Sequence, residues 1–337
     1  MRSQQIWRPA RVIAAEEIAE DIRQITFAVD GFHGAFDPGS HTNIKVSIKG
    51  VPAIRTYTVV PSAAGTLAIA VKLHPNSRGG SAFIWQLQVG DRTEMTEPEN
   101  RFELSWRAEH YLLIAGGIGI TPIYGMAKAL AARGRPLKLL YAARRRDAMA
   151  FASDLQSLLG ERLATFAQDE GQTLNLQEAF ADLPSDTEAY VCGPLALLDA
   201  AKAAWIASGR PISRFRYEVF GDSGLFPEES FTVSVQGLDL SVDVRPDQTM
   251  LEALEEAGVP MIHDCRRGEC GLCAVKIVSA TAPLDHRDVF FSEEERQHDP
   301  RICACVSRAR GGQLVIDTGY VSESVSMRPM GDQLTHA

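Results

Sequence analysis

The chain has 337 residues, a length that predicts two or three domains, and its 45% hydrophobic and 23% charged residues are typical of a soluble globular protein. The net charge of −9 argues against a nucleic-acid partner, because neutralising phosphates requires basic patches. The sequence contains no run of about 18 apolar residues and no secretory leader, so we expect no membrane span and a cytoplasmic location.

Residues 1–106 contain several short segments that favour β-strands. Residues 23–29, 41–48, 54–60 and 65–73 are rich in β-branched and aromatic residues and are separated by Gly, Pro, Asn and Asp turn signals. Closely spaced short strands of this kind predict an antiparallel barrel or sandwich.

Two patterns in this region suit an aromatic cofactor that carries a phosphate. In "RTYTVV", Arg55 can pair with a phosphate, the Tyr57 ring can pack on an isoalloxazine, and the Thr58 hydroxyl can hydrogen-bond to flavin N5. In "RGGS", residues 79–81 stand at an expected helix start, where backbone N–H groups can bind an anion. Taken alone, each pattern also fits an exposed strand face or an ordinary capped helix.

Residues 107–222 change character, because strands now alternate with helices. The segments "YLLIAG", "LKLLYAA" and "AYVCG" are typical of buried strands, and each is followed by a helical pattern. This alternation predicts a parallel, doubly wound sheet.

The segment "YLLIAGGIGITP" has a glycine turn between its strand and its helix, although it lacks the usual G-x-G-x-x-G fingerprint. Gly116, Gly117 and Gly119 allow close approach of a pyrophosphate, and we expect Thr121 to cap the helix, with Pro122 in its first turn. A tight packing turn between strand and helix is the alternative interpretation. A second glycine turn follows the later strand in "VCGP", and its cysteine also suits a purely buried position.

Residues 223–230 form a polar linker, and residues 231–337 form a small α+β domain. We expect a hairpin around Gln236 and Gly237 in this domain. A short helix follows, because Thr249 and Glu252 have the spacing of a capping box and a glycine stands where the helix should end.

The chain has six cysteines, and five of them lie in its last quarter. Cys265, Cys270 and Cys273 have the spacing C-x4-C-x2-C, which with a distant fourth cysteine is the plant-type [2Fe–2S] pattern. A structural zinc site is the alternative, but zinc usually takes paired C-x2-C knuckles. Cys303 and Cys305 both qualify as the fourth ligand, because on a strand they would point to the same face.

Three segments of this domain resemble the C-terminal ferredoxin domain of the phthalate dioxygenase reductase family: "CRRGECGLC", "PLDHRD" and "CVSRA". The resemblance implies a β-grasp, plant-type ferredoxin domain over residues 231–337. It also implies that Cys305, which opens "CVSRA", is the fourth ligand beside Cys265, Cys270 and Cys273. Cys303 is then a buried cysteine that does not bind the cluster.

The R-x-Y-T strand and the G-G-S turn are similar to the flavin barrel of the same family, which implies a barrel over residues 1–106. The family binds FMN at this place. The resemblance implies that FMN is held by Arg55, Thr56, Tyr57, Thr58, Gly79, Gly80 and Ser81, with Lys72 and Arg78 as additional contacts.

The two glycine turns resemble those of the nucleotide-binding domain of the ferredoxin–NADP reductase superfamily, here over residues 107–222. The resemblance implies that the dinucleotide is held by Gly116, Gly117, Gly119, Thr121 and Arg144, with Cys192, Gly193 and Pro194 beside the nicotinamide. It also implies that Phe220, in "RYEVFG", approaches the flavin, so that the residues at the reaction centre are Thr58, Cys192 and Phe220. Arg145 and Arg146 could favour a 2′-phosphate by pairing with it, whereas the family implies NADH.

The order of the three domains implies an electron-transfer reductase. A flavin takes a hydride from NADH and a [2Fe–2S] cluster passes single electrons to a partner protein, by resemblance a Rieske-type oxygenase that hydroxylates or demethylates its substrate. A reductase for a cytochrome P450 or another acceptor is one alternative. An iron–sulfur redox-sensing regulator is another, although no basic helix-turn-helix pattern supports it.

Overall fold

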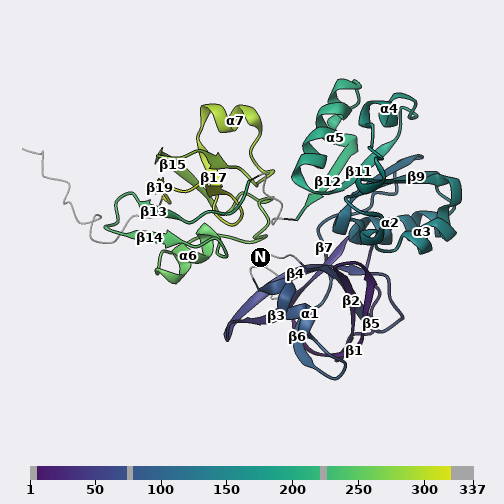
Figure 1. The fold of residues 1–337 in the computed structure, drawn as a ribbon, viewed down its shortest axis with the longest axis horizontal. Coiled ribbons are helices and arrows are strands. Elements are labelled where there is room, and N and C mark those ends of the chain that lie inside the picture. Colours follow the sequence, from purple (N-terminus) through teal and green to yellow (C-terminus); the bar gives the residue numbers. More distant parts are fainter. Residues whose placement is uncertain (1–5, 74–78, 221–225, 320–337) are drawn as a thin grey trace, which may run out of the picture. The chain divides into compact units, whose positions relative to one another are not determined.

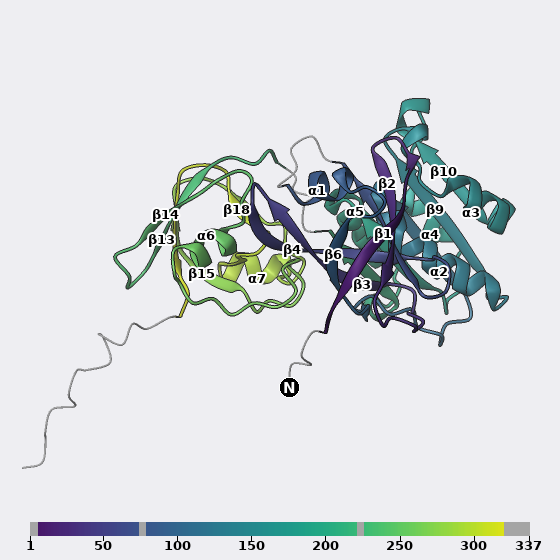
Figure 2. The same ribbon diagram turned by 90° about the horizontal axis from the view of Figure 1, so that it is seen from below.

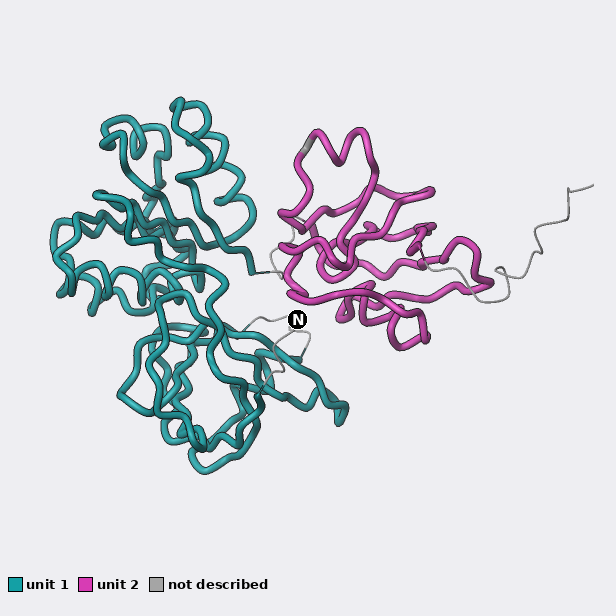
Figure 3. The backbone as a smooth tube through the Cα atoms, turned by 180° about the vertical axis from the view of Figure 1, so that it is seen from behind, with its two compact units in different colours: residues 1–220 teal, residues 221–337 magenta. Residues whose placement is uncertain are grey.

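The computed structural model describes residues 6–73, 79–220 and 226–319. The chain forms two compact units, residues 1–220 and residues 221–337 (Figure 3). The first unit holds both the expected barrel and the expected nucleotide-binding domain, and the second holds the cysteines. Within the described ranges, no helix combines the length and the apolar character that crossing a membrane would require.

The first part of unit 1 is a closed antiparallel β-barrel, drawn in purple to blue in Figure 1. Its strands are β1 (Trp7–Ala19), β2 (Ile22–Val29), β3 (Ser40–Ile48), β4 (Val51–Val60), β5 (Thr66–Lys72), β6 (Arg92–Thr96) and β7 (Glu99–Asn100). The order β4-β5-β2-β1-β6-β3 closes because β3 also pairs with β4, which makes a barrel and not a sandwich. Helix α1 (Gly80–Gln86) packs against β3 and β5.

The second part of unit 1 is a parallel sheet with helices on both faces. Its strands are β8 (Tyr111–Gly116), β9 (Leu137–Ala143), β10 (Leu163–Ala167), β11 (Glu188–Gly193) and β12 (Phe215–Val219). Its helices are α2 (Ile120–Ala132), α3 (Ala152–Leu159), α4 (Leu176–Ala181) and α5 (Leu195–Ala207). Helices α2 and α3 cover one face of the sheet and α4 and α5 cover the other (Figure 1). The doubly wound sheet predicted from the sequence is confirmed.

The strand order is β10-β9-β8-β11-β12, with all strands parallel. The chain adds β9 and β10 on one side of β8 and then β11 and β12 on the other side, so the order reverses between β8 and β11. In doubly wound sheets, ligands bind in the crevice at the carboxyl ends of the strands where the order reverses. The two glycine turns of the sequence follow β8 and β11, so both stand at this reversal point.

The barrel and the parallel sheet share one hydrophobic core. Ile22, Val60 and Ala68 of the barrel belong to the same buried cluster as Leu113 of β8 and Ile123 of α2, and all five are at most 2% exposed. Burying apolar surface stabilises a fold by about 25 cal/mol per Å². The shared core therefore holds the two parts as one unit.

Unit 2 is a mixed five-stranded sheet with a helix packed against it (Figure 1 and Figure 2). Its elements are β13 (Phe231–Val235), β14 (Ser241–Val244), α6 (Met250–Glu256), β15 (Ala274–Ala280), β16 (Leu284–Asp285), α7 (Glu293–His298), β17 (Arg301–Cys303), β18 (Arg308–Ala309) and β19 (Gln313–Asp317). The strand order is β14-β13-β19-β15-β17, with β13 and β19 parallel, while β16 and β18 form a separate pair.

Local signals in unit 2 have the structures expected of them. The hairpin β13–β14 forms, and Thr249 and Glu252 make both hydrogen bonds of a capping box at the start of α6. Gly258 adopts a φ of 80° just beyond the helix end, a conformation that favours glycine. The buried face of α6 then packs into the core of the unit.

Candidate functional site

Arg55 lies across the start of α1, which unites the two flavin patterns of the sequence. A Cβ atom at Gly80 would come within 2.9 Å of the Arg55 Nε and 2.8 Å of its Cγ, so only glycine leaves room for this side chain. Gly79, the N-cap of α1, has a φ of 90°, and a Cβ there would collide with Ile48. The glycines thus bring the Arg55 guanidinium to the first turn of a helix, together with Ser81, an arrangement suited to a phosphate.

The other predicted flavin residues follow Arg55 along β4. Tyr57 is half-buried and packs against the barrel core, whereas the exposed Thr56 donates a hydrogen bond to the Asn43 side chain at 2.6 Å. Thr58 is only 5% exposed, and its hydroxyl has no hydrogen-bond partner among the described residues. Buried polar groups are normally satisfied, so this hydroxyl fits a bound flavin.

Lys72 and Arg78 are the two further predicted flavin contacts. Lys72 is the last residue of β5 and is half-buried. Arg78 lies outside the described residues.

The two glycine turns of the nucleotide domain touch each other. A Cβ at Gly119 would stand 2.3 Å from the carbonyl oxygen of Cys192, and one at Gly116 would stand 2.7 Å from Pro194. Packing between the turns therefore accounts for glycine at both positions, which is the alternative that the sequence left open. Gly117 differs, because its φ is 53° and no described atom lies within 4 Å of its Cβ position. Gly117 is the position of this turn that leaves space for a pyrophosphate.

Thr121 does not cap α2. The helix is preceded by a 3-10 turn, Gly117–Gly119, and begins at Ile120, so Thr121 lies inside its first turn. The Thr121 hydroxyl donates to the carbonyl oxygen of Ile118 at 3.1 Å, and the side chain is 2% exposed. The predicted capping role is therefore wrong, because the helix starts earlier than the sequence pattern indicated.

Cys192, Gly193 and Pro194 lie where β11 ends, beside the turn that follows β8. Cys192 is fully buried. Phe220 follows β12 directly, is half-buried, and packs against the core that the barrel and the sheet share. These residues stand at the carboxyl edge of the sheet, as a nicotinamide site requires.

A buried row of four polar side chains joins the barrel to this edge. His41 of β3 is the antiparallel register partner of Thr58, and Glu218 of β12 is the parallel register partner of Cys192. The His41 Nε2 lies 2.5 Å from the Glu218 Oε1, and these side chains are 5% and 2% exposed. Register partners place their side chains together on one face. We name Thr58, His41, Glu218 and Cys192 the junction row.

Sequence reasoning missed His41 and Glu218. His41 belongs to none of the predicted site patterns, Glu218 lies in "RYEVFG", of which only Phe220 was assigned a role, and their contact joins β3 to β12. The available signals were two polar side chains in otherwise strand-like segments. His41 lies three residues before Ile44, the register partner of Arg55, and Glu218 lies two residues before Phe220.

The cysteines of unit 2 come together from two segments. Cys265, Cys270 and Cys273 lie on the loop between α6 and β15, and Cys273 directly precedes β15. Cys303 ends β17, whereas Cys305 lies in the turn that follows, so the two are not on one strand as the sequence suggested. The turn is fixed by hydrogen bonds from the Ala304 N–H to the Cys273 carbonyl and from the Ser307 N–H to the Cys303 carbonyl.

The thiol contacts differ between the two candidate fourth ligands. Cys305 is in hydrogen-bonding contact with both Cys265 and Cys273, and Cys265 also contacts Cys270. Cys303 makes such a contact with Cys273. Cys265, Cys273 and Cys305 are at most 8% exposed, and the contacts connect the four thiols of the predicted set in the order Cys270, Cys265, Cys305 and Cys273. A two-iron cluster takes four cysteine thiolates, and this donor set fits one.

Hydrogen bonds within the cysteine group shift its pKa values. Contact with the Cys305 thiol lowers the pKa of Cys265, assisted by the backbone N–H groups of Arg267, Glu269 and Cys270, although burial opposes the shift. The same contact raises the pKa of Cys305, which burial raises further. Iron, when bound, would compensate the charge of the four thiolates.

The "PLDHRD" and "CVSRA" segments form the scaffold that holds this site. Strands β16 and β18 pair directly, and the buried Ser307 hydroxyl donates to the Asp288 carboxylate at 2.8 Å. Asp288 also packs against Gly268 of the cysteine loop, whose φ is 75°, and a Cβ at Gly268 would lie 2.9 Å from the Asp288 Cα. One buried carboxylate thus braces both the turn of Cys305 and the loop of the other three cysteines.

Three known domain families match the chain in order. Residues 9–104 match an oxidoreductase FAD-binding domain, residues 113–203 an oxidoreductase NAD-binding domain, and residues 233–310 a 2Fe–2S iron–sulfur cluster binding domain. The toluene-4-sulfonate monooxygenase system reductase subunit of Comamonas testosteroni is 33% identical over 321 residues, which cover 92% of this chain and 98% of the relative. The chain belongs to the phthalate dioxygenase reductase family.

Solved structures agree with this assignment. The structure of phthalate dioxygenase reductase, described as modular for electron transfer from pyridine nucleotides to [2Fe–2S], is 29% identical, has a TM-score of 0.72, and covers 93% of this chain and 98% of its own. An intact type IV self-sufficient cytochrome P450 monooxygenase is 34% identical with a TM-score of 0.63, covering 92% of this chain and 41% of that one. This member of the family is therefore an oxidoreductase with flavin, NAD and [2Fe–2S] domains.

Cys305→Ser should abolish the cluster and Cys303→Ser should leave it intact, because only Cys305 contacts the thiols at both ends of the cysteine loop. Serine oxygen is a poor ligand for a site that favours soft thiolates. The measurement is visible absorbance together with iron and acid-labile sulfide content of each purified variant. A cluster that survives in Cys305→Ser and is lost in Cys303→Ser would reassign the fourth ligand.

Proposed function

We propose that this protein is the reductase component of an oxygenase system, transferring electrons from NADH through FMN and a [2Fe–2S] cluster to a partner oxygenase. The observation that carries the proposal is the combination of four converging thiols in unit 2 with a flavin barrel and a nucleotide sheet that share one core in unit 1. When bound, the flavin would accept the hydride and the cluster would release electrons singly, which is chemistry that the cofactors supply.

In this proposal, residues of the chain bind and orient the flavin and the nucleotide. Arg55 holds the flavin phosphate at the start of α1, while Thr58 presents its buried hydroxyl to the ring. Gly117 leaves space for the pyrophosphate of the nucleotide. Cys192, at the carboxyl edge of the sheet, positions the nicotinamide. Phe220 excludes water from the place where the two rings meet.

The thiolates of Cys265, Cys270, Cys273 and Cys305 would hold the cluster. The backbone N–H of Arg267 lies 3.4 Å from the Cys265 sulfur. Hydrogen bonds to the sulfurs are one means by which a protein tunes the potential of an iron–sulfur cluster. The role of the loop is thus both to bind iron and to set how readily the cluster accepts an electron.

The likeness to oxygenase reductase subunits over nearly their whole length supports an oxygenase as the electron acceptor, and we favour one of the Rieske type. A cytochrome P450 is the second candidate. The observation in its favour is the match to the reductase part of the self-sufficient P450 monooxygenase. A pull-down from the native host that retrieves an oxygenase distinguishes the two acceptors by its cofactor, a Rieske centre or a haem.

Arg55→Ala should raise the dissociation constant of the flavin about tenfold or more, because a charge-assisted phosphate contact is lost. Arg92→Ala, which removes an exposed arginine of β6, is the matched control and should bind flavin normally. Fluorescence titration of the flavin-free protein provides the measurement. The flavin released from the wild type by heating should co-chromatograph with FMN; release of FAD would contradict the FMN assignment.

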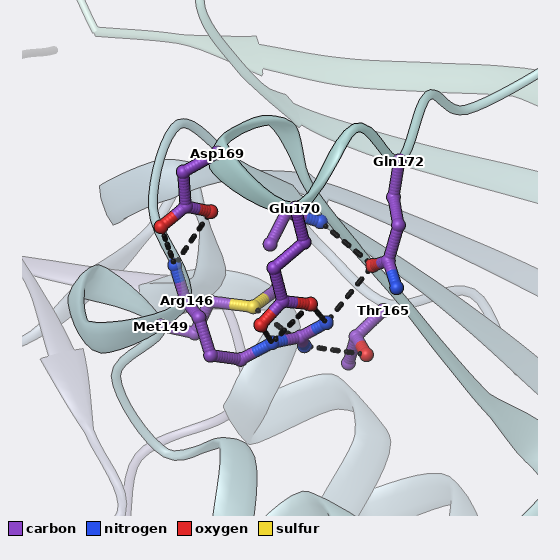
Figure 4. A network of polar contacts seen from close by, with 7 residues as sticks. Arg146, Met149, Thr165, Asp169, Glu170 and Gln172 are labelled. Carbon is purple, nitrogen blue, oxygen red and sulfur yellow. Dashed lines mark hydrogen bonds and ion pairs between the residues drawn. The ribbon is translucent and has the colours of Figure 1, made fainter.

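We also propose a preference for NADH over NADPH, based on the arginines that follow β9. All five N–H donors of the Arg146 guanidinium have acceptors (Figure 4). Two donate to Glu170, and the others donate to Thr165, Gln172 and the sulfur of Met149. Hydrogen bonding to Glu170 raises the pKa of Arg146 and lowers that of Glu170. No donor of Arg146 remains for a 2′-phosphate.

Arg145 is also engaged by carboxylates. It forms ion pairs with Glu20 and Asp21, and its Nε lies 3.2 Å from Asp147. The side chain of Arg144 is exposed at the end of the same strand, as its predicted role in holding the dinucleotide requires. The negative charge around Arg145 and Arg146 would repel the additional phosphate of NADPH.

Glu170→Ala should raise the kcat/KM for NADPH relative to NADH about tenfold, because it releases the Arg146 guanidinium to pair with a phosphate. Glu161→Ala, on an exposed neighbouring segment, is the control and should leave the ratio unchanged. Steady-state reduction of ferricyanide with each nucleotide gives the ratio. An unchanged ratio in Glu170→Ala would remove Arg146 from the specificity argument.

Anaerobic stopped-flow mixing with NADH tests the relay itself. We expect the flavin absorbance to bleach first and the cluster absorbance to follow, because the nucleotide site shares its core with the barrel and not with unit 2. A cluster that stays oxidised after the flavin is reduced would contradict the proposed function.

A further inference from the structure

The junction row contains a buried carboxylate that no part of the proposed mechanism uses. Glu218 is 2% exposed and stands beside Cys192, at the place proposed for the nicotinamide. A carboxylate in such surroundings is costly unless a partner compensates its charge. The partner is His41, whose Nε2 lies 2.5 Å away and which comes from the barrel.

The position of His41 connects this carboxylate to the flavin side. His41 is the register partner of Thr58, whose buried hydroxyl has no hydrogen-bond partner among the described residues. The Nδ1 of His41 is likewise buried without such a partner in the described ranges. Two unsatisfied polar atoms on register partners, one of them on the predicted flavin strand β4 and the other on β3, indicate that a ligand completes this place.

The charge at Glu218 matters for the reaction. An uncompensated negative charge beside the flavin would disfavour its electron-rich reduced form. The ion-pair contact with His41, at 2.5 Å, would offset this charge. The barrel thus supplies the group that neutralises a carboxylate on the nucleotide sheet.

We propose that His41 is a positioning residue for hydride transfer: it neutralises and holds Glu218 between the flavin side at Thr58 and the nicotinamide side at Cys192. This inference rests on the proposed function and adds a residue to it. His41 acts through Glu218, so its removal changes the environment of the rings and leaves the binding contacts of Arg55 and Gly117 in place.

The test compares His41→Leu, His41→Gln and the double variant His41→Leu/Glu218→Gln in the full-length, cofactor-loaded protein. His41→Leu should slow flavin reduction by NADH about tenfold or more at saturating NADH, with little change in KM, and should lower the flavin midpoint potential. His41→Gln, which keeps a donor toward Glu218 but cannot offset its charge, should shift the rate and the potential in the same direction as leucine, by a smaller amount. The double variant should recover the potential, because no uncompensated charge remains.

His110 supplies the matched control. Its Nδ1 lies 3.0 Å from the Asp186 carboxylate, but this pair stands just before β8, at the opposite edge of the same sheet. His110→Leu should leave both the potential and the rate within about twofold of wild type, as expected for a partly exposed pair.

The outcomes separate this inference from the proposed function. If NADH fails to reduce the flavin of the wild type, the proposed function is wrong. If the wild type is reduced and His41→Leu matches it in rate and potential, only the role of His41 is refuted. If His41→Leu does not fold, His41→Gln decides alone: a slower rate and a lowered potential support the inference, and wild-type values of both overturn it.

Discussion

The core shared by the barrel and the parallel sheet is the constraint on which the rest of unit 1 depends. Apolar residues from β2, β4 and β5 are buried in one cluster with residues of β8 and α2. This packing brings β3 of the barrel against β12 of the sheet, so that His41 meets Glu218. The proposed flavin and nicotinamide sites, which lie far apart in the sequence, thereby become neighbours.

In unit 2, backbone conformation brings the cysteines together. Glycines with positive φ at positions 268 and 271 let the loop of Cys265, Cys270 and Cys273 fold tightly. The Asp288–Ser307 contact then joins this loop to the turn that carries Cys305. The loop conformation and this contact hold the four cysteines of the predicted set near one another, where iron would compensate the charge of their thiolates.

Features determined by neighbouring residues could be predicted from the sequence. The capping box of Thr249 and Glu252 and the alternation of the parallel sheet with its helices depend on local spacing, and both are confirmed. Strand β1 escaped prediction, because its alanines, glutamates and proline are poor strand formers and pairing with β2 and β6 overrides that preference. Its place is determined by closure of the barrel.

Features determined by distant contacts could not be predicted. Position 119 requires glycine because a Cβ there would collide with the Cys192 carbonyl oxygen. The N–H donors of Arg146 are occupied by acceptors that include Thr165. The choice between Cys303 and Cys305 needed the family resemblance, because the end of β17 at Cys303 is not visible in the local sequence. In each case the deciding partner comes from another strand or loop.

The central claim is that hydride transfer is completed within unit 1 and that the cluster serves only the later electron transfer. The most direct measurement is the rate of flavin reduction by NADH in the full-length Cys305→Ser protein, beside its rate of cytochrome c reduction. We predict that flavin reduction keeps the wild-type rate while cytochrome c reduction is lost. Flavin reduction that falls together with cytochrome c reduction would contradict the account.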